Sequence, residues 1–449
     1  MAELFGTDGI RGVANRYPVT PEIALRLGKA LGHVLQSEHK PSKRVLIGKD
    51  TRLSGYMLET ALTSGLVSSG MDVFLVGPLP TPAVAHLTRS MNAAVGIMLT
   101  ASHNPFDDNG IKLFDMEGFK LRDEIEEKLE DAILSSSISS DHIRSDRLGK
   151  AHRIEDARGR YIEFAKNSIG SHNLEGLKII LDCANGAAYR IGPWIFEELG
   201  ADVTEMNVEP DGYNINNECG ALHPETVAKA VVDKGADIGI AFDGDADRVI
   251  FCDEKGRVID GDRVLAMCAL HFKETGSLAK DTFVVTTMSN LGLRDAMRMK
   301  GIKTEVTDVG DRYVIDRMRR DGFNLGGEKS GHLIFMDYAT TGDGIISALQ
   351  VLRLMQDKNV PVSELADCME EYPQQLVSIR VTDKKPIDEV LSLTQAIQAC
   401  QAELGDKGRI VVRYSGTEPK IRFLVEAQDG ALVDKWIAEL TQIAEKELV

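Results

Sequence analysis

The sequence predicts an α/β protein of three similar, tandem βαβαβ domains with mixed, mostly parallel sheets. A C-terminal α+β domain follows, and all four domains are expected around one central cleft. Three observations carry this prediction. Short apolar runs alternate with helical stretches, the alternation recurs three times within 449 residues, and its character changes after about residue 369. The expected domains are residues 1–155, 156–256, 257–368 and 369–449.

The three repeats are read in the same way, as strand, helix, strand, helix and strand, followed by a polar loop. In the first, after a helix at about 21–37, strands are expected at 44–48, 72–77 and 93–99, with helices at 57–69 and from residue 82. In the second, strands are expected at 177–182, 201–206 and 238–242, with helices at 192–199 and 224–234. In the third, strands are expected at 283–287, 303–307 and 323–326, with helices at 291–299 and 311–320.

The last part of the chain has a different pattern. Strands are expected at 376–381, 409–412 and 421–425, followed by an amphipathic helix at 430–446. One face of that helix carries Leu432, Trp436, Leu440 and Ile443. A serine- and aspartate-rich stretch, 134–147, is expected as an exposed connection between the first two repeats.

Composition narrows the function classes. The net charge of −17 argues against nucleic-acid binding, which needs a basic face. Six dispersed cysteines without C-x-x-C spacing indicate reduced thiols in a cytoplasmic protein. We expect no signal peptide, because the N-terminal residues lack a basic segment followed by an apolar one. We expect no membrane partner, because no stretch approaches the ~18 uninterrupted apolar residues of a span. An anionic substrate must therefore meet a local cluster of arginine and lysine.

The stretch Leu99-Thr100-Ala101-Ser102-His103-Asn104-Pro105 follows the third apolar run. Ser102 is thus expected at the carboxyl end of a strand, where open α/β sheets place their ligands. A serine there can act as a nucleophile or a phosphate carrier, provided that a base, a metal or a donor activates it. His103 is adjacent and Lys112 follows. The alternative, for this stretch alone, is a polar turn with an incidental serine.

Three carboxylates alternate in the loop Asp243-Gly244-Asp245-Ala246-Asp247-Arg248. Closely spaced oxygen ligands without histidine or cysteine suit a hard cation, and we expect Mg²⁺. A calcium loop of the EF-hand kind is the alternative, since Glu254 stands at its twelfth position. The apolar residues after Arg248 read as a strand and not as an exiting helix, which favours Mg²⁺ over calcium or a solvated turn.

Three further loops carry groups for substrate binding. The glycine-rich opening, 5–12, offers Arg11 to a phosphate. The loop 327–332 offers Glu328 and Ser330 to sugar hydroxyls. The loop 413–422 joins two strands of the last domain and offers donors to a phosphate: Arg413, Ser415, Gly416, Thr417 and Arg422. Each loop alone can equally be an ordinary turn. Together with Ser102 and the carboxylates they indicate phosphoryl transfer on a polyhydroxylated phosphate ester.

With these motifs in this order, the whole chain resembles the α-D-phosphohexomutase family. The resemblance implies that Ser102 is the phosphoserine, that Ser102, Asp243, Asp245 and Asp247 hold Mg²⁺, and that Arg11, His103, Lys112 and Arg248 surround the reacting phosphoryl group. It assigns Glu328 and Ser330 to the sugar, and Arg413, Ser415, Gly416, Thr417 and Arg422 to the non-reacting phosphate. The four domains then carry, in order, the phosphoserine, the metal, the sugar and the phosphate.

Within that family the opening Phe5-Gly6-Thr7-Asp8-Gly9-Ile10-Arg11-Gly12 and the stretch 308–313 resemble the amino-sugar branch. That branch interconverts glucosamine 6-phosphate and glucosamine 1-phosphate through a bisphosphorylated sugar, on the way to UDP-N-acetylglucosamine. The glucose and mannose branches usually carry Gly-His where this chain has Gly310-Asp311. Lys329 stands where glutamine is more usual. A glucose or mannose phosphate mutase, a metal-dependent phosphatase and a non-catalytic sugar-phosphate sensor are the alternatives, and a homodimer is one expected assembly.

Overall fold

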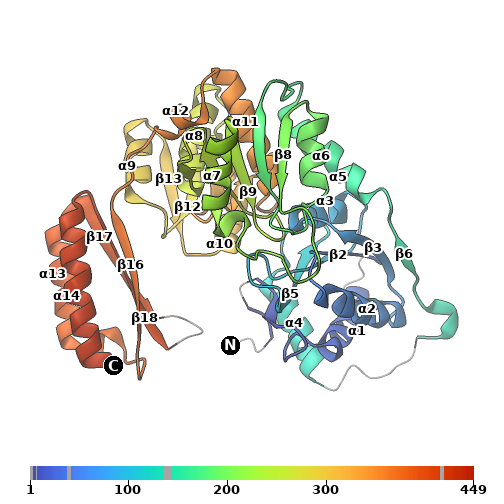
Figure 1. The fold of residues 1–449 in the computed structure, drawn as a ribbon. Helices are drawn as coiled ribbons and strands as arrows, with labels where there is room; N and C mark the ends of the chain where they lie inside the picture. The colour runs from blue at the N-terminus through green and yellow to red at the C-terminus, as the bar shows by residue number, and fades with distance from the viewer. Residues whose placement is uncertain (1–3, 7, 38–41, 136–142, 415–418) are drawn as a thin grey trace. The chain divides into compact units, whose positions relative to one another are not determined.

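The computed structural model describes residues 4–6, 8–37, 42–135, 143–414 and 419–449. The chain divides into two compact units. The first comprises residues 1–288 and 302–368, and the second comprises 289–301 and 369–449. Figure 1 labels their helices and strands along the chain.

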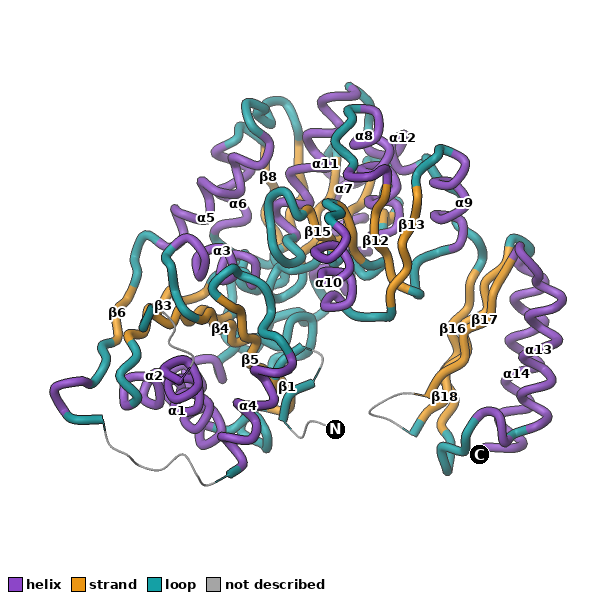
Figure 2. Tube along the Cα trace, turned by 180° about the vertical axis from the view of Figure 1, so that it is seen from behind, coloured by secondary structure: helices purple, strands orange, loops and turns teal. Residues whose placement is uncertain are grey.

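The first region of unit 1 is built on a six-stranded sheet in the order β1-β5-β4-β2-β3-β6. Its elements are β1 Ile10–Val13, α1 Pro21–Ser37, β2 Arg44–Lys49, α2 Ser54–Ser68, β3 Asp72–Pro78, α3 Thr81–Ser90, β4 Val95–Leu99, β5 Asp108–Asp115, α4 Asp123–Leu134 and β6 Ala151–Arg153. The helices α1 and α2 lie side by side along one face of this sheet (Figure 2). Their apolar residues form its core, which includes Leu27, Leu31, Leu58 and Leu62.

The second region holds a five-stranded sheet in the order β11-β10-β9-β7-β8. Its elements are α5 Ala157–Lys166, β7 Lys178–Asp182, α6 Ile191–Glu198, β8 Asp202–Met206, α7 Pro224–Lys234, β9 Ile238–Phe242, β10 Val249–Asp253 and β11 Val258–Ile259.

The third region holds a four-stranded sheet in the order β13-β12-β14-β15. Its elements are α8 Gly261–Glu274, β12 Thr282–Thr286, β13 Lys303–Thr307, α10 Asp311–Asp321, β14 Leu325–Gly327, β15 Leu333–Phe335, α11 Gly344–Lys358 and α12 Val362–Ala366.

The three regions repeat one arrangement, which confirms the predicted threefold α/β organisation. The strands β2, β7 and β12 each pair in parallel with the next strand along the chain and with the one after it. In each region the third of these strands is followed along the chain by an antiparallel neighbour, as in β4–β5, β9–β10 and β14–β15. The predicted loops that carry Ser102, the three carboxylates and Glu328 are these connections. They therefore occupy equivalent positions at the carboxyl ends of parallel strands.

The structure corrects parts of the element prediction. Residues 10–12, expected within the glycine-rich loop 5–12, belong to β1, Ile10–Val13, which pairs with β5. The strands β5 and β15 are also absent from the βαβαβ reading, as are the helices α8 and α11. The helix α9, Leu291–Met299, is predicted at its observed position but clusters with the second unit.

Unit 2 is an α+β domain, as predicted. Its three-stranded antiparallel sheet has the order β16-β18-β17, formed by Gln374–Arg380, Lys420–Ala427 and Gly408–Tyr414. The helices α13, Leu391–Leu404, and α14, Gly430–Leu448, pack together on the sheet (Figure 2). Trp436 and Leu440, predicted for the inward face of the last helix, are buried in the core, and Leu432 and Ile443 pack partly buried against it.

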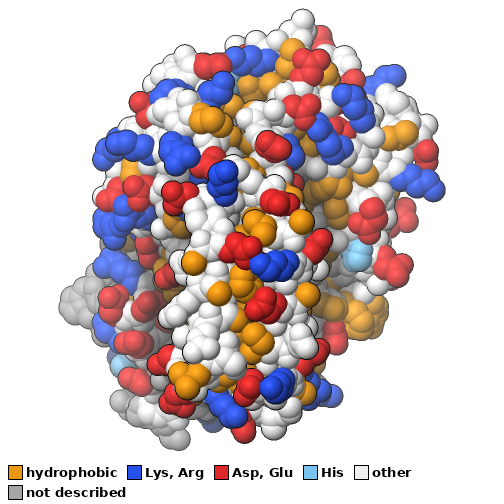
Figure 3. Space-filling view, turned by 90° about the vertical axis from the view of Figure 1, so that its left-hand side faces the viewer, with side chains coloured by type: hydrophobic (Ala, Val, Ile, Leu, Met, Phe, Trp, Pro, Cys, Tyr) orange, Lys and Arg blue, Asp and Glu red, His pale blue; other side chains and the backbone are white. Residues whose placement is uncertain are grey.

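Among the described residues, no helix is long and apolar enough to cross a membrane. All six cysteines are free thiols. On the face shown in Figure 3, acidic and basic side chains are interspersed.

Candidate active site

Ser102 lies in the loop between β4 and β5, and its backbone adopts the left-handed conformation with φ 52°. This conformation is uncommon for residues with a side chain, and it persists only where the surroundings hold it. The residue is 1% exposed. Its Oγ donates a 2.6 Å hydrogen bond to Oδ2 of Asp243. The serine hydroxyl therefore faces the carboxylate loop of the second region.

The loop that carries Ser102 is held by Arg52, a fully buried residue in the segment after β2. The guanidinium donates to four main-chain carbonyls of this loop: Ser102 (2.9 Å), Asn104 (2.8 Å), Asp108 (3.0 Å) and Pro105. Its Nε pairs with Asp50 at 2.8 Å. Asp50 also accepts a 2.7 Å hydrogen bond from Thr100, whose Oγ1 accepts from the main-chain N–H of Ser102 at 2.9 Å. Hydrogen bonds to the main chain and the Arg52–Asp50 ion pair together therefore fix the conformation of the serine loop.

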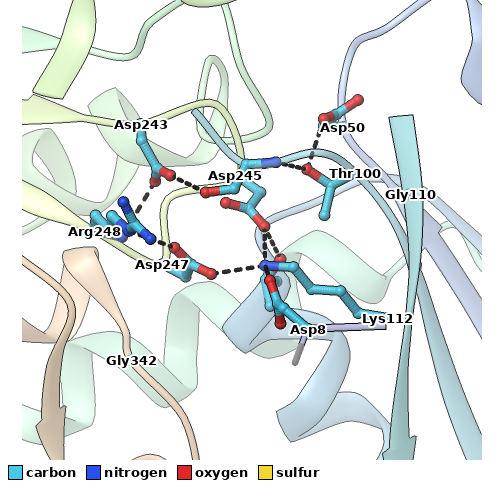
Figure 4. Close-up of polar contacts among 12 residues, drawn as sticks. Asp8, Asp50, Thr100, Gly110, Lys112, Asp243, Asp245, Asp247, Arg248 and Gly342 are labelled. Atoms are coloured by element: carbon cyan, nitrogen blue, oxygen red, sulfur yellow. Dashed lines mark hydrogen bonds and ion pairs between the residues drawn. The ribbon is translucent and has the colours of Figure 1, made fainter. Parts of the chain in front are cut away.

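The three carboxylates among the predicted metal ligands follow β9 and lie on one loop (Figure 4). Their alternating spacing brings one carboxylate oxygen of each within 4.8 Å of the others, and all three residues are buried. Gly244 is needed in this loop, because a Cβ there would lie 2.6 Å from the carbonyl oxygen of Ser102. The side chain of Asp245 also accepts a hydrogen bond from Thr81. The carboxylates and the serine are therefore locked into close contact.

Lys112, on β5, is the principal cation beside these carboxylates. Its Nζ lies 2.9 Å from Asp245 and 2.8 Å from Asp247, and 3.5 Å from Asp8 (Figure 4). Burial opposes its charge, but these carboxylates raise the pKa of Lys112 well above that of a free lysine. Lys112 therefore stays charged and neutralises part of the acidic cluster.

The donor set fits a hard cation. The buried Oδ1 atoms of Asp245 and Asp247 have no hydrogen-bond partner among the described residues. Burial, together with the charges of Asp247 and Asp245, raises the pKa of Asp243 well above that of an ordinary aspartate. Orphaned oxygens and mutual repulsion are both relieved by a bound cation, and oxygen-only ligands favour a hard one. The three carboxylates are thus a group that could hold a metal ion.

Three more predicted residues contact Ser102 or pair with nearby carboxylates. The Nδ1 atom of His103 lies 3.2 Å from Ser102 Oγ. Burial and the nearby charges of Arg248 and Arg11 lower the pKa of His103 to about 4, so its imidazole is neutral at pH 7. Arg248 Nε lies 3.9 Å from Asp247, and Arg11 pairs with Asp8. A neutral imidazole therefore lies beside the serine, and the charges of both arginines act on that imidazole.

The third loop, 327–332, connects β14 to β15. The Glu328 carboxylate accepts a 3.2 Å hydrogen bond from the N–H of Gly310, whereas Ser330 is exposed. His332, which the sequence analysis did not single out, is buried with Nδ1 3.6 Å from Asp247 Oδ1. Gly342 lets the chain pass this ring, since a Cβ there would lie 2.4 Å from Nε2. The loop thus reaches the carboxylates through His332.

The predicted phosphate-binding residues lie in unit 2. Arg413 is the penultimate residue of β17 and Arg422 lies on β18, and the two are directly opposite in the antiparallel register. Like charges in such a pair repel, and a bound anion relieves the repulsion. Ser415, Gly416 and Thr417 lie outside the described residues.

The structure places the following predicted residues in one region: Ser102, the three aspartates, Lys112, His103, Arg11 and Arg248. The sequence prediction missed several residues that contact them. Asp50 and Arg52 hold the serine loop, Asp8 and Thr81 touch its charged neighbours, and Asn216 donates to the Ser102 carbonyl at 2.9 Å. A signal for the first two exists. They directly follow β2, which pairs with β4, so the carboxyl ends of both strands meet at one edge.

Family models match almost the whole chain. Four models of the phosphoglucomutase/phosphomannomutase family match: alpha/beta/alpha domain I at residues 2–138, domain II at 159–256, domain III at 260–372 and the C-terminal domain at 376–443.

Two relatives are similar over their full lengths. The phosphoglucosamine mutase of Syntrophotalea carbinolica is 52% identical over 447 residues, covering 99% of this chain and 98% of the relative. That of Myxococcus xanthus is 52% identical over 448 residues, covering 99% and 97%.

Solved structures share the fold. A phosphoglucomutase/phosphomannomutase family protein of Burkholderia thailandensis superposes with a TM-score of 0.79 at 24% identity, covering 98% of this chain and 97% of that one. The N-acetylphosphoglucosamine mutase of Aspergillus fumigatus, in complex with GlcNAc-6P and magnesium, gives a TM-score of 0.69 at 18% identity, covering 100% and 96%.

Proposed function

Because this chain belongs to the phosphoglucomutase/phosphomannomutase family, we propose that it is a phosphoglucosamine mutase. It interconverts glucosamine 6-phosphate and glucosamine 1-phosphate, and it is therefore an isomerase that works by phosphotransfer. One observation of the site carries the proposal: a buried serine hydroxyl lies 2.6 Å from one of three clustered carboxylates. A phosphate carrier and a cation site are thus adjacent, as phosphoryl transfer requires.

The reaction consists of two phosphoryl transfers. In the first, the free hydroxyl oxygen of the substrate attacks the phosphorus of phosphoserine 102, the bond from phosphorus to Oγ breaks, and the hydroxyl proton ends on Oγ. The bisphosphorylated sugar then reorients in the site. In the second transfer Oγ attacks the phosphorus of the other phosphoryl group, the bond from that phosphorus to the sugar oxygen breaks, and the proton of Oγ ends on the sugar oxygen. The neutral imidazole of His103, 3.2 Å from Oγ, is placed to pass the proton in each direction. Arg11, Lys112 and Arg248 supply positive charge to the transferring group.

The cation of this site is Mg²⁺ in our proposal. Asp243, Asp245 and Asp247 would hold it together with the phosphorylated Ser102. When bound, it neutralises charge on the transferring phosphoryl oxygens. The orphaned oxygens of Asp245 and Asp247 and the absence of nitrogen or sulfur ligands in the cluster support this assignment. The Aspergillus structure that shares the fold was solved with magnesium.

Substrate binding is assigned to two further loops. Glu328 and Ser330 bind sugar hydroxyls. Arg413 and Arg422, with Ser415, Gly416 and Thr417 of the same hairpin, hold the phosphate that is not reacting. The cross-strand arginine pair supports this role, because its repulsion is relieved by an anion. Because this loop holds whichever phosphate is not reacting in each orientation of the sugar, one site can serve both transfers. Exclusion of water from the site would protect the phosphoserine from hydrolysis.

A coupled assay tests the function. Purified protein is phosphorylated, intact mass spectrometry follows the phosphoryl group, and kcat/KM is measured with glucosamine 6-phosphate, glucose 6-phosphate and mannose 6-phosphate. We expect glucosamine 6-phosphate to be preferred and phosphate to be conserved. A higher kcat/KM for glucose or mannose phosphates would reassign the substrate. Stoichiometric release of inorganic phosphate would make the protein a phosphatase, and no turnover of any sugar would leave a sensor.

A further inference from the structure

The helix α10 begins with two residues whose side chains both make polar contacts with the first region of unit 1. Asp311 Oδ2 lies 2.6 Å from Nζ of Lys120. The next residue, Arg312, donates to the carbonyl of Leu121 and pairs with Asp123 and, at 3.3 Å, with Glu126. Two consecutive side chains therefore tie the start of α10 to the segment 120–126.

Other contacts hold the same segment against the third region. Thr340 Oγ1 donates to the carbonyl of Gly118 at 2.6 Å. The guanidinium of Arg319, on α10, lies 3.7 Å from the centre of the Phe119 ring. The connection between β5 and α4 is thus fixed on both sides of Lys120, so this lysine has little freedom to reorient.

Lys120 is also one member of a closed ring of charges. Its Nζ bonds Asp8, whose other carboxylate oxygen lies 3.5 Å from Lys112 Nζ. On the other side, Asp311 Oδ2 lies 3.6 Å from His332 Nε2. Acidic and basic groups alternate around the ring, in the order Asp247, Lys112, Asp8, Lys120, Asp311 and His332.

The ring is shielded from solvent, which makes its charges interdependent. The side chains of Lys112 and His332 are each 3% exposed, that of Lys120 is 11% exposed, and those of Asp311 and Asp8 are 15% and 22% exposed. Lys120 is the cation between Asp8 and Asp311. Without it the two carboxylates repel across a poorly screened gap, and each side of the ring can move. The two groups that move with them, Lys112 and His332, both contact Asp247.

We propose that Lys120 and Asp311 are positioning residues of this active site. Lys120 acts through Asp8, which pairs with Lys112 and Arg11, and Asp311 acts through His332. The inference rests on the proposed mutase function, and it explains the Asp311-Arg312 pair by a contact between regions. Because sugar and phosphate binding are assigned to other loops, loss of either residue should reduce turnover more than substrate binding.

Lys120→Met, Asp311→Asn and the double variant test this proposal in the full chain. We expect each single change to lower kcat about 10- to 100-fold, since misplacement by about 1 Å can cost 10²-fold. KM should stay within about threefold of wild type. The double variant should be no slower than the slower single, because both changes break the same contact. Lys120→Arg, which keeps the charge, should return kcat to within about threefold of wild type.

A matched control and an assay independent of turnover complete the design. Lys166 also sits between two acids, at 2.7 Å from both Glu163 and Glu198, and Lys166→Met should leave kcat unchanged. Hydrogen exchange over residues 308–320 should speed up in Lys120→Met. If the wild-type protein has no mutase activity, the proposed function is wrong, but the ring of side chains is still tested by hydrogen exchange. Wild-type kcat in Lys120→Met, multiplying losses in the double variant, an equally inactive Lys120→Arg or unchanged exchange would overturn the positioning role.

Discussion

Replacing Arg52 tests whether the serine loop is held in place from the protein interior. Its guanidinium makes five hydrogen bonds, four to carbonyls of the loop and one to Asp50. A lysine ammonium has three donors. Arg52→Lys therefore loses at least two of these bonds, which we estimate at about 2–4 kcal/mol of folding stability in total. Arg52→Met also leaves Asp50 as an unpaired buried charge, a loss of about 3–5 kcal/mol for that pair alone.

The same change should slow catalysis, because the carbonyl of Ser102 is one of the four acceptors. A displaced serine loop separates Oγ from Asp243, and we expect Arg52→Lys to lower kcat at least about 10-fold. Urea unfolding followed by circular dichroism measures the stability, and the coupled mutase assay measures kcat. Arg44→Lys is the matched control, since this exposed arginine bonds a single carbonyl, that of Met91, at 3.1 Å. An Arg52→Lys variant with wild-type urea midpoint and kcat would refute the reasoning.

Four further predictions concern the site and its surroundings. Ser102→Ala should lose nearly all mutase activity while its circular dichroism stays native; retention of most kcat would remove Ser102 as the carrier. Asp245→Asn should lower both kcat and the dependence on Mg²⁺, measured by titrating Mg²⁺ after chelation, and full activity without a divalent cation would contradict the metal site. Burial raises the pKa of Asp343 from 3.8 to about 6 in the folded chain, so the folded state binds more protons than the unfolded state. The free energy of unfolding should therefore fall by up to about 3 kcal/mol as pH rises from 4 to 6. The urea midpoint of Asp343→Asn should lack this part of the decline, and equal pH profiles of variant and wild type would disprove the prediction. Arg422→Ala should weaken turnover in both reaction directions.

The sequence predicts most of the fold because hydrophobic alternation is strong in the parallel strands. β2, β4, β7, β9 and β12 are apolar runs buried on both faces, and these appear at the predicted positions. β5 escapes the prediction because it buries polar residues, among them Asn109 and Lys112, which break its apolar pattern. β15 has only three residues. The helix α11 is buried nearly all round, so it lacks the polar face on which a periodic pattern depends.

The residues of the site likewise fall into those that the sequence predicts and those that it does not. Ser102 and the three aspartates stand in contiguous motifs, so residue type and spacing suffice to find them. Arg52, Asp8 and Lys120 act through contacts with residues distant in the chain. Lys120 and Asp311, for example, are 191 positions apart in the numbering but 2.6 Å apart in space. No local pattern encodes such a pair, because the same lysine in a solvated turn has the same neighbours in sequence. The motifs therefore predict the residues that carry the chemistry, whereas the residues that orient them are found only from the packing of the folded chain.

The phosphate-binding hairpin carries the remaining part of the proposed function. Arg413 and Arg422 are cross-strand partners, and each is proposed to meet the non-reacting phosphate of either substrate. Loss of one charge-assisted contact costs about 1.5–3 kcal/mol, or about 10- to 150-fold in binding or rate. Because energy from a remote phosphate also serves the chemical step, Arg422→Ala should lower kcat as well as raise KM. Arg380→Ala is the control, since this exposed arginine lies on β16 of the same sheet, paired with Lys420. Steady-state constants are measured with glucosamine 6-phosphate and with glucosamine 1-phosphate. A loss with only one of them would show that the hairpin meets a single orientation of the sugar, and unchanged constants with both would exclude it from substrate binding.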